Sequence, residues 1–151
     1  MIEIVEFLKK PEKFAKMGIK IIYIHPESER QPVKTLQEIR ELGKEAGIVL
    51  SPEISVDTIK PLLSLIDYIM VMTVNPGFAG QKYLSLVDEK IDELVKFKDK
   101  YNFKILIDGA CSPEKIKILS LKGVQGFVLG TSALFNKNKK YKEIIPKLRN
   151  L

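Results

Sequence analysis

The sequence predicts an α/β protein with a parallel sheet covered by helices. Strand-like runs of β-branched and apolar residues alternate with longer stretches whose apolar residues recur at helical spacing, at a repeat of ~25 residues. No neighbouring pair of strand-like runs carries the signal of an antiparallel hairpin. Alternation of this kind produces right-handed βαβ units. The 151 residues, of which 45% are hydrophobic and 29% charged, are expected to form one domain that spans residues 1–151.

Six strands are predicted, each bounded by turn-forming residues, at residues 1–8, 19–24, 48–50, 68–74, 103–107 and 124–129. Amphipathic helices are predicted at residues 10–17 and 32–47, from residues 55, 81 and 112 onward, and at residues 140–150. Gly18 ends the first helix as a C′ glycine would. Ser55 and Ser112 are the expected N-caps of two later helices, and Pro113 suits the first helical position. Both an open doubly wound sheet and an incomplete (β/α)8 barrel fit this pattern.

The chain is organised around residues 68–81. An apolar, β-branched run ends at Val74, and Asn75-Pro76-Gly77 then stops the strand, because proline lacks a donor and glycine tolerates positive φ. A strand that ends in a glycine-bearing loop and leads into a helix lets backbone amides close on an anion. Many such turns carry glycines for steric reasons only. The spacing alone therefore leaves both a phosphate site and a tight turn open.

The residue identities in several segments are more specific than their spacing. They are IHPES (24–28), VLSPE (49–53), VMTVNPGFAGQ (71–81), LIDGACS (106–112) and VLGTSALFN (128–136). Together they closely resemble the ribulose-phosphate 3-epimerase family, in order and with family-like gaps from about Pro11 to Leu134. The variant with Ala79 is most similar to the D-allulose-6-phosphate 3-epimerase branch.

The resemblance implies a (β/α)8 TIM barrel of roughly 200 residues or more. Matched to that barrel, this chain begins near the third strand, so we expect an incomplete barrel of about six βα units that lacks the first two. Such a piece leaves two strand edges unpaired. It should aggregate, borrow strands from a partner chain, or be a fragment of a longer or truncated reading frame. We therefore expect a homo-oligomer where the chain folds.

Asp108 is the predicted catalytic residue. It follows Ile105-Leu106-Ile107, so its carboxylate emerges at the tip of an apolar strand. An isolated Asp-Gly pair would favour a turn or an N-cap near Ser112. By resemblance, Asp108 instead ligates a divalent metal (Zn, Fe(II), Mn or Co) and serves as one of two acid/base carboxylates in the inversion of carbon 3 of a ketose phosphate.

The implied metal site is incomplete in this sequence. The family uses two histidines and two aspartates, and only Asp108 is matched. One histidine and one aspartate belong to the absent second strand, and Val5 stands where the remaining histidine is expected. Glu6 is adjacent, but its side chain should point to the other face of a strand.

The predicted substrate site is better preserved. By resemblance, three glycine-bearing turns hold the sugar phosphate and one methionine lines the pocket. These substrate-binding residues are Met72, Gly77, Phe78, Ala79, Gly80, Gly109, Ala110, Gly130 and Thr131. A barrel-core role for Met72 stays equally open.

Other residues are less specific. His25, the single histidine, suits a structural role at a strand end better than a substrate contact, and Cys111, the single cysteine, suits a small buried residue better than a reactive thiol. The net charge of +6 is concentrated near the last helix, where we expect a solvated face and no nucleic acid partner. No run spans a membrane and no signal peptide is evident, so a cytoplasmic location is expected.

The sequence thus predicts a ketose-phosphate 3-epimerase that is impaired as a lone chain. Three alternatives stay open: a non-catalytic sugar-phosphate-binding remnant, a fragment that needs complementation, and a basic interaction module.

Overall fold

The computed structural model describes residues 11–135 and 137–151. Within these residues, five parallel strands form one sheet, with bounds β1 (Ile21–Ile24), β2 (Glu45–Leu50), β3 (Tyr68–Met72), β4 (Lys104–Asp108) and β5 (Gly126–Val128). Each strand pairs with the next in the chain, in the order β1-β2-β3-β4-β5. A doubly wound sheet reverses direction at a switch point. This sheet does not, so the described strands follow the winding of a barrel and not of a doubly wound sheet.

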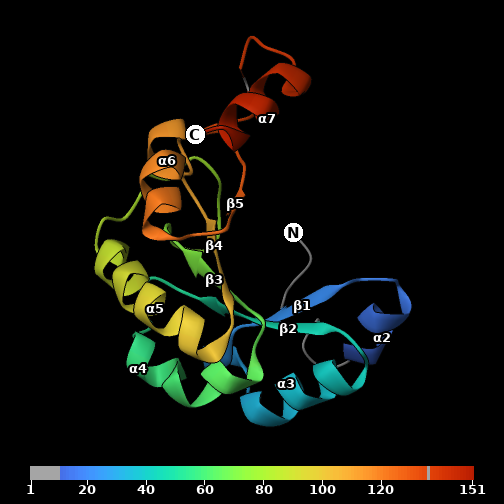
Figure 1. Cartoon of the computed structure of the whole chain (residues 1–151). Coiled ribbons are helices and arrows are strands. Elements are labelled where there is room, and N and C mark those ends of the chain that lie inside the picture. Colours follow the sequence, from blue (N-terminus) through green and yellow to red (C-terminus); the bar gives the residue numbers. More distant parts are fainter. Residues whose placement is uncertain (1–10, 136) are drawn as a thin grey trace.

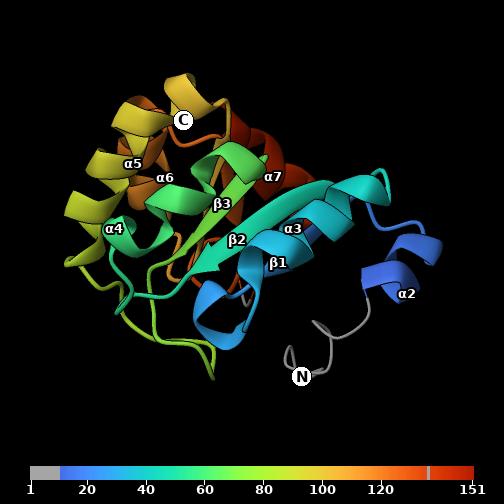
Figure 2. The ribbon, with the colours of Figure 1, turned by 90° about the horizontal axis from the view of Figure 1, so that it is seen from below.

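The helices are α2 (Pro11–Lys16), α3 (Pro32–Glu41), α4 (Val56–Ile59), α5 (Val87–Tyr101), α6 (Pro113–Lys122) and α7 (Tyr141–Arg149), with 3-10 helices η1 (Pro26–Ser28) and η2 (Lys60–Leu65). Figure 1 shows α3, α4, α5 and α6 along the outer, convex side of the curved sheet. Right-handed crossovers that always step in one direction place their helices on one face. In the view turned by 90°, helix α2 lies beyond β1, at the end of the molecule opposite to α5 and α6 (Figure 2).

The core lies between the sheet and these helices. Strand register places Ile24, Ile48, Ile69 and Ile105 in one row, because each pairs with the next. All four are completely buried. They pack in one cluster with fully buried helix residues that include Leu36, Ile39, Ile91 and Leu94. This apolar row crosses the sheet from the last residue of β1 to the second residues of β3 and β4.

Three predicted boundaries are wrong by three residues or more. The helix predicted at residues 32–47 ends at Glu41, because Gly43 adopts a left-handed φ of +69°. Strand β2 therefore begins at Glu45 instead of residue 48. The helix predicted from Gln81 begins only at Val87, because the Leu84 amide bonds back to the Thr73 carbonyl, 2.9 Å away, and keeps the segment before it in a loop.

Of the two predicted serine caps, one is confirmed. Ser112 Oγ accepts a hydrogen bond from the Lys115 amide at 3.2 Å, and Pro113 opens α6. Ser55 makes no such bond, and its Oγ lies 3.0 Å from Thr58 Oγ1 instead. The helix it was expected to cap lasts only four residues before continuing as η2.

Gly18 has a φ of +79°, as its predicted place after a helix requires. The strand predicted at residues 1–8 lies outside the described residues. Within the part of the chain that the structure describes, no helix is long and apolar enough to cross a membrane.

Candidate functional site

A cavity of about 300 Å³ lies at the carboxyl ends of β3, β4 and β5. Its lining includes every residue to which the sequence assigned a site role: Met72, Gly77, Phe78, Ala79, Gly80, Asp108, Gly109, Ala110, Gly130 and Thr131. Val74, Gln81, Val128 and Ser132 complete much of the wall. Three loops that are distant in sequence thus meet at one place, which is where parallel α/β folds bind ligands.

Asp108 forms part of the wall of this cavity. It is the last residue of β4 and pairs in register with Met72 of β3 and Val128 of β5, so the three side chains share one face of the sheet. Burial raises the pKa of the Asp108 carboxyl above its ordinary value, although a hydrogen bond from the Gly109 amide opposes the shift. A carboxyl with a raised pKa is better suited to accept and return a proton near neutral pH.

One wall is the loop between β3 and α5. Gln81 Nε2 donates hydrogen bonds to two carbonyls of this loop, that of Asn75 at 2.6 Å and that of Phe78 at 2.9 Å. Gly77 and Gly80 adopt φ values of +136° and +88°, which few other residues tolerate. The sequence analysis gave Gln81 no role. The glutamine closes the loop by satisfying its carbonyls from within.

The facing wall is the turn after β4. Gly109 has a φ of +111°, and Ala110 a strained value of +44°. The Thr73 hydroxyl donates to the Gly109 carbonyl at 2.5 Å, and the Thr73 amide donates to the Asp108 carbonyl at 2.8 Å. Thr73 is completely buried. Sequence reasoning missed it, and its only signal was a hydroxyl residue near the end of an apolar strand.

Cys111 follows this turn and is 3% exposed. Burial, with the nearby Asp108 charge, raises the pKa of its thiol to about 12. Its Sγ lies 3.5 Å from the Gly109 carbonyl. A thiol held in its protonated form is a poor nucleophile, so the structural interpretation of Cys111 is favoured.

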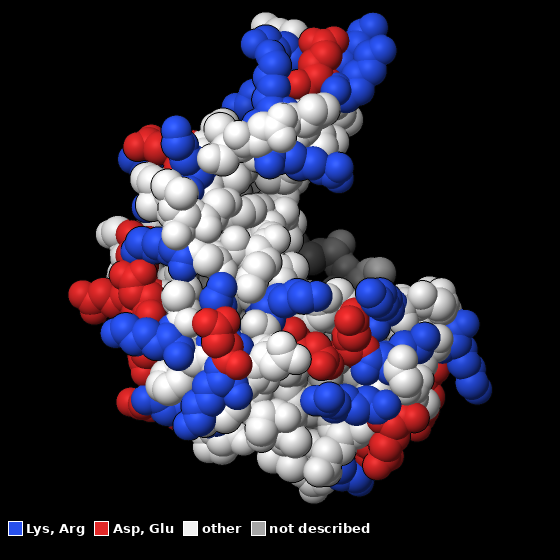
Figure 3. All heavy atoms as spheres, in the orientation of Figure 1, with Lys and Arg blue, Asp and Glu red and all other residues white. Residues whose placement is uncertain are grey.

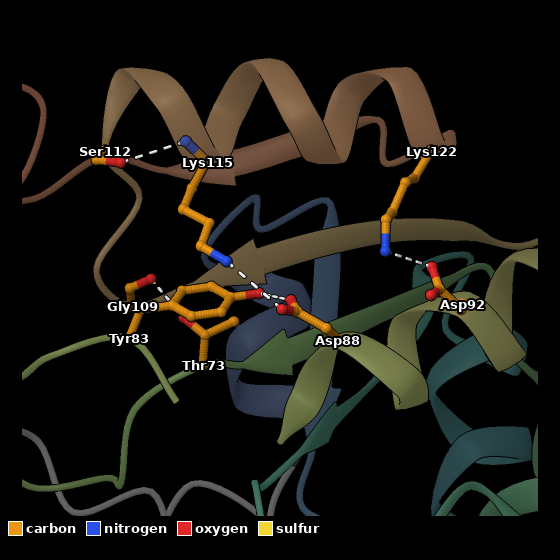
Figure 4. A network of polar contacts seen from close by, with 8 residues as sticks. All are labelled: Thr73, Tyr83, Asp88, Asp92, Gly109, Ser112, Lys115 and Lys122. Atoms are coloured by element: carbon orange, nitrogen blue, oxygen red, sulfur yellow. Dashed lines mark hydrogen bonds and ion pairs between the residues drawn. The ribbon is translucent and has the colours of Figure 1, made fainter. Parts of the chain in front are cut away.

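A polar cluster anchors the far end of the β3–α5 loop (Figure 4). The Tyr83 hydroxyl donates to Asp88 Oδ1 at 2.5 Å, and Lys115 Nζ lies 3.5 Å from Asp88 Oδ2 and 3.8 Å from the centre of the Tyr83 ring. Lys115 comes from the first turn of α6, and Asp88 from the first turn of α5. The cluster therefore links the β3–α5 loop to the first turns of α5 and α6.

His25 lies in a second polar group, at the ends of β1 and β2. Its Nδ1 is 3.2 Å from Glu27 Oε1, which also accepts a hydrogen bond from Ser51 Oγ at 2.5 Å. Burial alone would raise the pKa of Glu27, but these hydrogen bonds and one from its own amide outweigh burial and lower it. Lys90 Nζ donates to the carbonyls of Ser51 and Pro52 at 3.0 and 2.8 Å. None of these residues lines the cavity, which agrees with a structural role for His25.

The expected metal site is not built by the described residues. Within residues 11–135 and 137–151, no group of three or more histidine, cysteine, aspartate or glutamate side chains is placed to hold an ion. Among the described residues that line the cavity, Asp108 is the one of these types. Val5 and Glu6 lie outside the described residues. Metal binding through Asp108 therefore stays a prediction.

The basic C-terminal residues are exposed and surround α7. Figure 3 shows lysine and arginine side chains over this helix with acidic side chains among them, while both signs alternate over the rest of the visible face. A cavity of about 620 Å³ lies beside the helix, and its lining includes Lys137, Lys139, Ile144, Lys147 and Leu148. These lysines fit the solvated face that the sequence predicted.

Comparison with known proteins identifies the family. The sequence matches the model of the "Ribulose-phosphate 3 epimerase family" over residues 1–135. It is 40% identical to a "Ribulose-phosphate 3-epimerase" of Synechocystis sp. over 97% of this chain and 65% of that protein. With proteins of the same description, it is 39% identical to one from Helicobacter pylori, over 85% of this chain and 60% of that protein, and 34% identical to one from Escherichia coli, over 91% and 61%.

Among solved structures, one described as "Native KDPGal structure" is similar with a TM-score of 0.58 and 13% identity, over 95% of this chain and 66% of that chain. This likeness concerns the fold alone. The chain spans about 60–65% of the length of the three relatives named above. The family match and the identities nevertheless agree, and the chain belongs to the ribulose-phosphate 3-epimerase family.

Proposed function

We propose that the cavity binds a ketose phosphate and that Asp108 is an acid/base residue of a ketose-phosphate 3-epimerase. The observation that carries this proposal is the meeting of a half-buried carboxyl group with three glycine-bearing turns around one cavity. Family membership supports the same reaction.

The turns suit a phosphate group. Gly109, Ala110, Gly130 and Thr131 are small residues at the junctions between strands and helices, where backbone amides can approach an anion. A Cβ built on Gly130 would meet no atom within 4 Å, so the space beside this residue is open to a ligand. The Gly77–Gly80 loop closes the opposite side.

Asp108 would then act on carbon 3. Inversion removes a proton beside the carbonyl from one face of the sugar and returns a proton to the other face, so each face needs its own acid/base group. Asp108 serves one face. The divalent metal that the family resemblance implies would need further ligands besides Asp108.

A second candidate function is sugar-phosphate binding without turnover. It is favoured by the donor set, because the described residues place one carboxyl and no histidine in the cavity. Both candidates use the same phosphate site and differ in the role of Asp108.

The test is epimerisation of ribulose 5-phosphate and of allulose 6-phosphate by the purified chain, with and without added zinc, iron(II), manganese or cobalt. Asp108→Asn is the catalytic control, and calorimetric titration of each sugar phosphate measures binding separately. Turnover that Asp108→Asn abolishes supports the epimerase, and the preferred substrate decides the branch that Ala79 suggests. Binding without turnover supports the second candidate. Absence of both overturns the proposed function.

We also propose a homo-oligomer in the cytoplasm. Strands β1 and β5 are the outer strands of the described sheet, and Val128 of β5 is 42% exposed. Light scattering during size-exclusion chromatography measures the mass of the protein in solution. We expect Val128→Lys to reduce this mass. Leu121→Lys, on the exposed side of α6, is the control and should leave the mass unchanged. A monomeric wild-type protein would contradict this part of the proposal.

A further inference from the structure

We infer that Thr73 is the positioning residue that sets the geometry of the phosphate site, by fixing the turn at Asp108–Ala110 against the loop at Gly77–Gly80. This inference rests on the proposed function. Thr73 does not line the cavity, so it acts through the residues it holds.

The first argument is the number of hydrogen bonds that meet at Thr73. Its amide donates to the Asp108 carbonyl at 2.8 Å, its hydroxyl donates to the Gly109 carbonyl at 2.5 Å, and its carbonyl accepts from the Leu84 amide at 2.9 Å. The first two bonds reach the turn after β4, and the third closes the base of the β3–α5 loop. One buried residue therefore connects both walls of the cavity.

The second argument is the direction of the peptide groups. A trans peptide is planar, so its N–H points opposite to its C=O. Because the Asp108 and Gly109 carbonyls both point to Thr73, the amides of Gly109 and Ala110 point away from it. The Gly109 amide bonds the Asp108 carboxyl. The Ala110 amide makes no hydrogen bond to a described residue, and Ala110 lines the cavity, so this donor is left for an anion.

The third argument is the strain of the turn. Gly109 and Ala110 both have positive φ, and this conformation is costly for alanine. A Cβ on Gly109 would lie 2.7 Å from Val74 Cγ2 and 3.1 Å from Thr73 Oγ1, so the residues just after β3 pack tightly against the turn. A strained turn persists only when its surroundings hold it. The buried Thr73 hydroxyl donates the shorter of two side-chain hydrogen bonds to the Gly109 carbonyl, at 2.5 Å against 3.5 Å for Cys111 Sγ, and so holds the turn (Figure 4).

The experiment compares Thr73→Val, which keeps the shape of the side chain and removes the donor, with Thr73→Ser, which keeps the donor. Calorimetry measures the affinity of each variant for ribulose 5-phosphate and for inorganic phosphate. Thr73→Val should weaken both by about tenfold or more, and Thr73→Ser should restore affinity to within about threefold of wild type. Ile39→Ala, a buried change in α3 away from the cavity, controls for loss of stability alone.

Two results would overturn the inference: unchanged affinity in Thr73→Val, or an equal loss in Ile39→Ala. Hydrogen exchange gives a readout that does not need binding. The Ser112 amide, which bonds the Ala110 carbonyl at 2.8 Å, should exchange faster in Thr73→Val and not in Thr73→Ser. If the wild-type chain binds no sugar phosphate, the proposed function fails, and unchanged exchange at Ser112 would independently refute the positioning role.

Discussion

Met72 and Asp108 lie opposite each other at the last paired position of β3 and β4. This register places a half-buried thioether beside the carboxyl group and leaves Asp108 without a cationic partner among its described neighbours. The neighbourhood therefore favours the protonated carboxyl. Its consequences can be measured as the pH dependence of folding stability.

Asp108→Asn should change that dependence. Because burial raises the pKa of Asp108 in the folded state, the folded protein binds a proton more readily than the unfolded chain does. The contribution of Asp108 to stability is greatest below its unfolded pKa and is lost as the pH rises through the raised folded value. Urea unfolding from pH 3 to pH 8 should show Asp108→Asn gaining stability relative to wild type across that rise. Asp99→Asn, at an exposed position, is the control, and a parallel pair of curves for Asp108→Asn would refute the prediction.

Alanine at the site glycines should have graded effects. Gly109→Ala combines a positive φ with a Cβ 2.7 Å from Val74 Cγ2, so we expect the free energy of unfolding to fall by about 3 kcal/mol or more. Gly80→Ala meets the same kind of strain in open space and should cost about 1–2 kcal/mol. Gly130→Ala introduces neither positive-φ strain nor a close contact, so its free energy of unfolding should stay within about 0.5 kcal/mol of wild type. Chemical unfolding measures the stability of all three variants. Any other ranking would show that φ strain and Cβ contacts do not set the cost at these glycines.

Ser51→Ala should destabilise the protein by about 2 kcal/mol at neutral pH, because its hydroxyl bonds the ionised Glu27 carboxylate. Hydrogen bonds lower the pKa of Glu27 in the folded state. The stabilisation is therefore present above the unfolded pKa and is lost as the pH falls through the lowered folded value. The difference in unfolding free energy between Ser51→Ala and wild type should therefore become smaller in acid. Ser55→Ala, whose hydroxyl meets only Thr58, should show little effect at either pH.

Tyr83→Phe should weaken the anchor of the β3–α5 loop. The hydroxyl donates to the Asp88 carboxylate at 2.5 Å, and its removal should cost about 1.5–2 kcal/mol. Faster hydrogen exchange at Leu84 would place the loss in the loop. Tyr101→Phe removes a hydroxyl that makes no hydrogen bond to a described residue, and it should cost less than about 0.5 kcal/mol. Equal losses in the two variants would show that the anchor contributes nothing specific.

Much of the fold was predictable because the elements are marked locally. Apolar β-branched runs gave the five described strands, and the Ser112-Pro113 pair gave the start of α6. The boundaries that failed depend on distant partners. Strand β2 extends back to Glu45 because its amide pairs with the Lys20 carbonyl at 3.0 Å and the Ala46 amide with Asp67 Oδ2 at 2.8 Å. Neither partner is visible in a local pattern.

The sequence by itself determined the residue types of the site: an aspartate at the tip of an apolar strand and glycines where the backbone must turn. These choices follow from φ/ψ preferences and strand patterning, which act over a few residues. Only the tertiary structure decided the direction of winding, the pairing of Met72 with Asp108, and the role of Thr73. The hydrogen bond from Thr73 to Gly109 joins positions 36 residues apart, and it exists only because β3 and β4 pair in one register.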